Sequence, residues 1–143
     1  MKLHISSLLP ASRERVFAAL VDPEVLRRAI PGCESLTPAG DDTYEATLKI
    51  GVAGLKGTYT GKAAIRDQRP PDALSLSFEG KGSPGFVRGS STIALTPEAD
   101  ATRVSADADV QVGGLIAAVG SRLVEAAAKK LADDFFKQLA EQL

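Results

Sequence analysis

Three glycines between residues 80 and 90 have the spacing that binds nucleotide phosphates in some folds. The segment reads GKGSPGFVRGS, which fits the GxGxxG pattern from Gly80 to Gly85. That pattern holds a pyrophosphate only where a strand leads into it and a helix follows, because the helix N-terminus supplies the amides. Here residues 86 to 95 continue as a strand, and Pro84 removes one amide from the loop. The pattern therefore does not predict a nucleotide site.

The same glycines are instead typical of a hairpin between two strands. Proline presets the second position of a tight turn and glycine adopts positive φ at the third, which predicts a turn over residues 83 to 86. Glycine also suits a bend where two backbones approach closely. We expect this hairpin to form a loop at the mouth of a pocket, with Phe86 near the opening and Arg88 on the solvent side.

Other residue types that could do chemistry are sparse. His4 and Cys33 are the only imidazole and the only thiol, whereas a zinc site needs three or four ligands. With His4 as the sole imidazole base, no Ser-His-Asp triad is predicted. Three acidic pairs are expected to be solvated surface: Asp41-Asp42, Asp107/Asp109 and Asp133-Asp134. No metal site and no catalytic site is predicted.

Composition narrows the class of protein. The 143 residues are 44% hydrophobic and 24% charged, which fits one globular domain over residues 1–143. The 17 basic and 18 acidic residues nearly cancel, so no broad field exists to hold nucleic acid. A single cysteine excludes an internal disulfide and favours the cytoplasm. No signal peptide and no run of about 20 apolar residues is found, so a soluble chain is expected.

The first third of the chain predicts one strand and two short helices. Residues 2–9 read as a strand that Pro10 ends. Ser12 is placed to cap a helix, and Asp22 followed by Pro23 is placed to start another. Pro31-Gly32 ends the second helix.

Residues 33 to 113 have the period of two that predicts strands. Turn signals divide the segment into about six strands with short loops, which implies antiparallel neighbours. One face of each strand is apolar and the other polar, so one face of the sheet is expected to be buried.

The last segment predicts one long helix, from about Leu115 to near the end. It would be about 40 Å long, enough to cross a sheet. Its apolar stripe steps by four residues and winds around the helix, so Phe136 and Leu143 would point away from Leu123. The members of the stripe are Leu123, Ala127, Leu131, Phe135 and Leu139. The elements together predict an α+β helix-grip fold, in which a curved antiparallel sheet packs on the long C-terminal helix.

Several inward positions of this sheet carry only small side chains. They are Ala46, Gly57, Gly61, Ala63, Ala106 and Ala108. Small residues either let the helix approach closely or leave a cavity for a ligand, and an empty apolar void is costly. Both alternatives remain open from the residues alone.

Five stretches of the sequence resemble a known family: AIPGCESL (29–36), DDTYEATLKIGVAGLKGTYTGK (41–62), GKGSPGF (80–86), ADVQVGG (108–114) and GSRLVEAAAKKLADDFF (120–136). Together they resemble the CoxG family of carbon monoxide dehydrogenase subunits, which is part of the START-like (Bet v 1-like, SRPBCC) superfamily. The resemblance implies the helix-grip fold. It also implies a non-enzymatic accessory of a molybdenum hydroxylase of the carbon monoxide dehydrogenase type.

The resemblance further implies a peripheral place on the inner face of the cytoplasmic membrane. It implies no covalent cofactor, and a cavity able to hold a quinone or another lipid-like molecule. Many relatives carry a variable tail after the long helix, whereas this sequence stops at Leu143, so anchoring through its own tail is not expected.

We expect the cavity to lie between the sheet and the long helix. Tyr59 is of interest because its hydroxyl could bond a ligand carbonyl, although it could equally bond to protein or water. Leu20, Ile30 and Cys33 would border the entrance. The expected wall is Leu48, Ile50, Tyr59, Phe78 and Val112 from the sheet, and Leu115, Val119 and Leu123 from the helix.

Two other functions are compatible with the same fold. START-like folds also include cyclases and hydrolases, but an enzyme would need an inward polar cluster. A filled-core interaction module could use Phe136 and Leu143 as its contact patch, unless these residues belong to a frayed or locally covered helix end.

Overall fold

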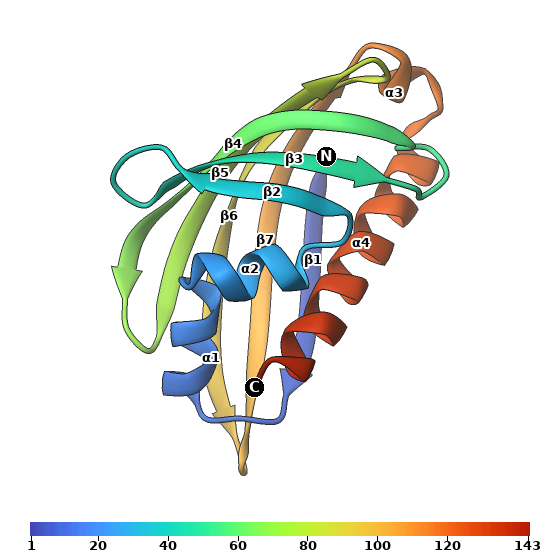
Figure 1. Ribbon diagram of the computed structural model, residues 1–143. Helices are drawn as coiled ribbons and strands as arrows, with labels where there is room; N and C mark the ends of the chain where they lie inside the picture. The colour runs from blue at the N-terminus through green and yellow to red at the C-terminus, as the bar shows by residue number, and fades with distance from the viewer.

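The computed structural model describes residues 1–143 as one curved sheet with helices along one side (Figure 1). All seven strands pair antiparallel, in the order β1-β7-β6-β5-β4-β3-β2. This confirms the predicted strand, two short helices and six further strands of a helix-grip fold. The elements are β1 (Lys2–Leu9), α1 (Arg13–Leu20), α2 (Pro23–Ala29), β2 (Cys33–Pro38), β3 (Thr43–Ile50), β4 (Gly57–Arg69), β5 (Ala73–Gly82), β6 (Gly85–Glu98), β7 (Ala101–Gly113), α3 (Leu115–Ala118) and α4 (Ser121–Glu141).

The two short helices begin where the sequence predicts. The Ser12 hydroxyl accepts a hydrogen bond from the Arg15 amide, and the Asp22 carboxylate accepts one from the Glu24 amide. Each cap satisfies a backbone donor that the first helical turn leaves free. Pro23 occupies the first position of α2.

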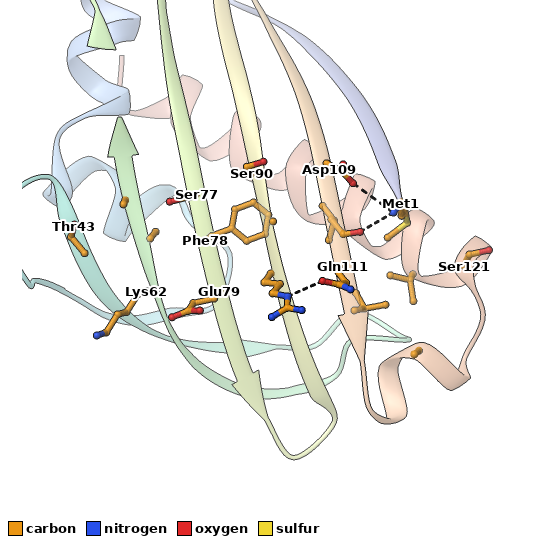
Figure 2. Close-up of a pocket in the computed structure, with 18 of the residues that line it drawn as sticks. Met1, Thr43, Lys62, Ser77, Phe78, Glu79, Ser90, Asp109, Gln111 and Ser121 are labelled. Carbon is orange, nitrogen blue, oxygen red and sulfur yellow. Dashed lines mark hydrogen bonds and ion pairs between the residues drawn. The ribbon is translucent and has the colours of Figure 1, made fainter. Parts of the chain in front are cut away.

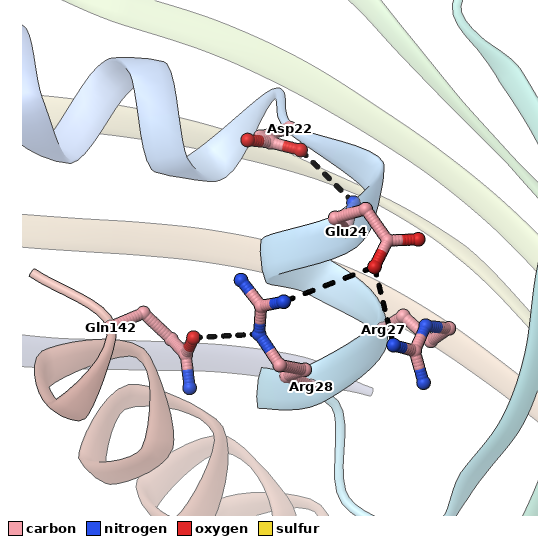
Figure 3. Close-up of polar contacts among 5 residues, drawn as sticks. All are labelled: Asp22, Glu24, Arg27, Arg28 and Gln142. Atoms are coloured by element: carbon pink, nitrogen blue, oxygen red, sulfur yellow. Dashed lines mark hydrogen bonds and ion pairs between the residues drawn. The ribbon is translucent and has the colours of Figure 1, made fainter.

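A polar cluster joins α2 to the end of α4 (Figure 3). Glu24 pairs with Arg27 at 3.2 Å and with Arg28 at 3.8 Å along α2. Arg28 also donates from Nε to the Gln142 side chain at 2.8 Å. Residues 114 positions apart are thereby held together, which fixes the C-terminal end of the chain against the short helices.

The prediction of one uninterrupted helix from Leu115 is wrong. The chain forms the single turn α3, breaks at Gly120 with φ +97°, and then starts α4 at Ser121. Glycine adopts this left-handed backbone without a Cβ penalty, so a break at that position costs little. The helix that packs beside the sheet is therefore 21 residues long.

The contact face of α4 also differs from the predicted stripe. Its buried residues are Val124, Ala127, Phe136 and Leu139, whereas Leu123 is exposed. Phe136 stacks edge-on with Phe135, and Leu143 packs against the same core. The apolar face winds around the helix as expected. Because α4 packs against both α2 and β1, the C-terminal part of this face is covered as well. Phe136 is therefore a core residue and Leu143 packs against the edge of the core, so the two do not form an exposed contact patch.

The chain continues after the three glycines as a strand, not a helix, which confirms the predicted hairpin. Gly82 pairs with Gly85, so the two central turn residues are Ser83 and Pro84, one position earlier than predicted. Gly85 has φ +135° and begins β6. A nucleotide-binding turn would require a helix at this point.

Glycines inside the central strands let the sheet bend sharply. A Cβ added at Gly61 would overlap the Glu79 carbonyl oxygen of β5. At Gly80, by contrast, the nearest atom to an added Cβ would be the Thr60 oxygen, 3.8 Å away. Gly61 and Gly80 are direct partners across β4 and β5. The close approach of β4 and β5 therefore requires glycine at position 61, whereas position 80 has space for a methyl group.

This difference makes Gly61→Ala and Gly80→Ala a matched pair. We expect Gly61→Ala to lower the free energy of unfolding by about 1–3 kcal/mol, because backbone must move to admit the methyl group. Gly80→Ala is expected to be neutral or slightly stabilising. Urea unfolding followed by circular dichroism measures both, and equal effects would contradict this account of the bend.

Candidate functional site

The buried side chains form two separate clusters. The lower cluster joins α1, α2 and the end of α4 to the strands, and the upper cluster joins the β3–β4 end of the sheet to α3 and the start of α4. The lower cluster consists of Leu9, Ala11, Val16, Phe17, Ala19, Leu20, Ala29, Ile65, Leu74, Leu95, Val104, Phe136 and Leu139. The upper cluster consists of Ile50, Leu55, Tyr59, Ile116, Val124 and Ala127.

The inward residues between these clusters, with the exception of Val110, are only partly buried. Tyr44, Ala63, Phe78, Gly89 and Val110 form one continuous row across β3 to β7, since each pairs with the next. Ala63, Phe78 and Gly89 lie on interior strands, yet none is fully buried. The small side chains of the row thus leave a hollow in the concave face, which we call the central hollow.

A pocket of about 910 Å³ adjoins this row (Figure 2). Phe78, Val112 and Val124 give it apolar lining from the sheet and from α4. Lys62 and Glu79 add polar lining from the outward face of the same strands. The pocket therefore takes lining residues from both faces of the sheet. Because β1 begins opposite Asp109, β7 has an open margin from Val110 onward.

The open margin of β7 is closed in part by the N-terminus of the chain. The Met1 ammonium donates to the Val110 carbonyl oxygen at 2.8 Å, and the Met1 carbonyl accepts from the Val110 amide. The Arg88 Nε donates to the Gln111 side chain on the outward face, also at 2.8 Å. The pocket therefore combines apolar side chains with a polar rim.

Most of the predicted wall residues from the sheet lie in or against the upper cluster. Ile50 and Tyr59 are buried there, and Leu48 packs against them. Phe78 and Val112 line the pocket. Of the residues predicted at the entrance, Leu20 is buried in the lower cluster, while Ile30 and Cys33 are half-buried at the junction of α2 and β2.

The predicted wall residues from the helix lie elsewhere. Leu115 is 71% exposed, Val119 43% and Leu123 42%, and none lines the pocket. The break at Gly120 turns α3 so that Ile116 is buried in their place. The expectation that these three side chains face the cavity is therefore wrong.

Phe86 is also on the other side of the sheet from its predicted place. Because β6 starts at Gly85, Phe86 shares the outward face with Arg88, whose guanidinium carbon lies 5.5 Å from the ring centroid. The Phe86 ring lies over Gly113 of the neighbouring strand. Val87 takes the inward position and packs on the upper cluster.

The Tyr59 hydroxyl is already used within the protein. It donates to the Leu55 carbonyl oxygen at 2.7 Å, and burial raises the pKa of Tyr59. The alternative of a core tyrosine bonded to protein is therefore correct. Tyr44 was not predicted as a site residue, although it lies on the row of the central hollow and its hydroxyl makes no hydrogen bond to the protein. The alternation of apolar and polar residues along β3 already places Tyr44 on the inward face in the sequence.

Reactive groups do not gather around the hollow. Burial raises the pKa of the Cys33 thiol, an effect that the nearby charge of Arg27 partly offsets, so the thiolate is disfavoured. His4 pairs with Asp107 at 2.7 Å, and both are exposed on the outward face. No group of three His, Cys, Asp or Glu side chains is placed to hold a metal ion.

Fold and site together define a START-like helix-grip protein with an apolar hollow in the concave face of its sheet. A conserved protein from Geobacillus kaustophilus is 37% identical, with a TM-score of 0.96 over 99% of this chain and 94% of that one. The chain belongs to the CoxG family of carbon monoxide dehydrogenase subunits, whose family model matches residues 7–143.

More distant structures share the fold. A START superfamily protein from Mycobacterium smegmatis is 14% identical, with a TM-score of 0.78 over 99% of this chain and 95% of that one. A protein from Chromobacterium violaceum is 18% identical, with a TM-score of 0.73 over the same shares. A comparison with curated proteins finds no match. None of the helices combines the length and the hydrophobicity that crossing a bilayer requires.

Tyr59→Phe tests the assignment of that hydroxyl. Removing its bond to Leu55 is expected to lower the free energy of unfolding by about 1 kcal/mol. Because the pKa of Tyr59 is raised above 10.0 in the folded state, the unfolded chain ionises first as pH rises. Wild-type stability should therefore fall through that alkaline range, and the variant should lose less. Identical pH profiles in urea unfolding would contradict the assignment.

Proposed function

We propose that the protein is a non-enzymatic accessory of a molybdenum hydroxylase of the carbon monoxide dehydrogenase type. In this proposal it works in the cytoplasm, carries a quinone in the central hollow, and links the enzyme to the cytoplasmic membrane. Membership of the CoxG family supports the partner class. The central hollow supports the apolar ligand, and it is the observation that carries the proposal.

The chemistry of the concave face favours binding over catalysis. The inward positions of the strands around the hollow are aliphatic, aromatic, glycine or hydroxyl residues, and the charged side chains of β3 to β6 alternate to the other face. General acid-base catalysis needs a titratable group within reach of the substrate. An apolar ligand needs only shape and a few polar contacts.

Two inward hydroxyls adjoin the hollow without lining the pocket itself, and one of them, Tyr44, packs against the lower cluster. Tyr44 lies at one end of the row that includes Phe78, and Ser91 lies inward on β6, beside Leu76. Neither hydroxyl donates to a protein acceptor, although Ser91 is only 8% exposed. A quinone carbonyl accepts a hydrogen bond, whereas an isoprenoid chain needs only apolar contact. Tyr44 is therefore the first candidate for contact with the headgroup.

Filling the hollow should abolish ligand binding without unfolding the protein. Ala63→Leu places a larger side chain inward beside Phe78. Ala94→Leu adds the same group on the exposed outward face of β6, away from the pocket, as a matched control. Ubiquinone-1 should raise the melting temperature of wild type and Ala94→Leu by several degrees, because it binds only the folded state. Ala63→Leu should show no shift. An equal shift in both variants would place the ligand elsewhere.

The hydroxyl of Tyr44 should matter for affinity and that of Tyr59 should not. Tyr44→Phe is expected to weaken ubiquinone-1 binding about fivefold, the value of one hydrogen bond of about 1 kcal/mol. Tyr59→Phe serves as the control, since its hydroxyl is bonded to Leu55. Isothermal titration measures both. Unchanged affinity in Tyr44→Phe would remove Tyr44 from the site.

The partner can be tested separately from the ligand. Ubiquinone-1 reduction by the purified molybdenum hydroxylase is expected to be faster in the presence of the wild-type protein than in the presence of Ala63→Leu. The same rate with either protein would exclude the accessory role in electron delivery, whatever the binding data show.

A further inference from the structure

Most of the exposed large apolar side chains gather at one end of the molecule. Four of the five are Phe86, Leu115, Val119 and Leu123, and only Leu8 lies elsewhere, on β1 opposite Arg103. In Figure 1, α3 and the β5–β6 hairpin lie together at one end, and α1 lies toward the other. We call residues 51–56, 81–86 and 114–123 the apical tip.

The three segments of the apical tip are in contact. The Ile116 amide donates to the Pro84 carbonyl oxygen at 2.9 Å, which joins α3 to the hairpin. A Cβ atom added at Gly54 of the β3–β4 loop would lie 3.0 Å from the Leu123 Cγ of α4. The loop and the start of α4 are therefore in close contact. The buried Ile116 side chain holds α3 in place, so its neighbours Leu115 and Val119 are left facing solvent.

The charges of the apical tip all have one sign. Its charged side chains are Lys56, Lys81 and Arg122, and it contains no aspartate or glutamate. All three are exposed and none is within ion-pair distance of a carboxylate. The whole chain has a formal net charge of −1, so this end differs from the molecule as a whole.

We propose that the apical tip is the surface by which this protein rests on an anionic lipid bilayer. Leu115, Val119 and Leu123 enter the interface, the Phe86 ring lies at the headgroup level, and the basic side chains meet lipid phosphates. This deepens the proposed membrane link and rests on it.

Two observations favour lipid over a protein partner. The combination of short aliphatic side chains, one aromatic ring and unpaired cations is typical of interfacial membrane contacts. The segment that carries Leu115 and Val119 also lines the pocket through Ala117, Gly120 and Ser121. A molecule that leaves the bilayer at the apical tip is therefore next to the opening it needs.

Vesicle co-sedimentation tests the surface with matched variants. The probe is vesicles of phosphatidylcholine mixed with phosphatidylglycerol, compared with phosphatidylcholine alone. Leu115→Ser with Leu123→Ser should reduce partitioning about tenfold or more, and Leu8→Ser should not. Each of Lys56→Gln and Arg122→Gln should reduce it about fivefold at low salt, whereas Arg15→Gln on α1 should leave it unchanged.

Three outcomes would overturn the proposal. Wild type could fail to bind anionic vesicles, or the Leu115/Leu123 and Leu8 variants could bind equally well. Alternatively, sedimentation could show a dimer that only the Leu115/Leu123 variant loses, which would assign the apical tip to a second copy of the chain. Melting curves of all variants exclude unfolding as the cause.

The ubiquinone-1 thermal shift, measured on the same samples, separates this proposal from the proposed function. A shift without vesicle binding would remove the lipid surface and leave the quinone site. Vesicle binding without a thermal shift would remove the quinone site and leave the lipid surface.

Discussion

The curvature of the central strands is the constraint on which the rest of the molecule depends. At Gly61 the backbones of β4 and β5 lie closer than any side chain would allow, within a strongly curved sheet (Figure 1). A bent sheet with small inward residues does not fill its own concave face, and α4 packs mainly along β1 and α2 beside it. The hollow is therefore a consequence of backbone geometry before any ligand is considered.

Stability comes from the two clusters on either side of the hollow. The lower cluster closes one end with the short helices and the last turns of α4, and the upper cluster closes the other with Ile116 and Val124. An empty apolar space between the two clusters costs free energy of unfolding. The packing within the clusters offsets that cost. A bound apolar molecule would restore the missing contacts.

The same division gives the two ends different surfaces. At the lower end α2 and α4 are joined by Arg28 and Gln142, and the apolar side chains are covered. At the apical tip the break at Gly120 exposes Leu115 and Val119 while Ile116 remains buried. A single glycine thus converts an expected cavity wall into an external surface, beside the pocket opening.

Sequence alone determined the element order, the antiparallel sheet, the inward and outward faces of β3 to β7, and the helix caps. These depend on local alternation and on nearby hydrogen bonds, which tertiary contacts did not override. Only the tertiary structure decided that Phe86 faces outward, because the turn lies one residue earlier than predicted and Phe86 therefore belongs to the strand, on the same face as Arg88. It also decided that Tyr59 bonds to Leu55 while Tyr44 is free, and that Leu123 is exposed. Each of these depends on which distant backbone lies opposite, and periodicity in one segment carries no information about that.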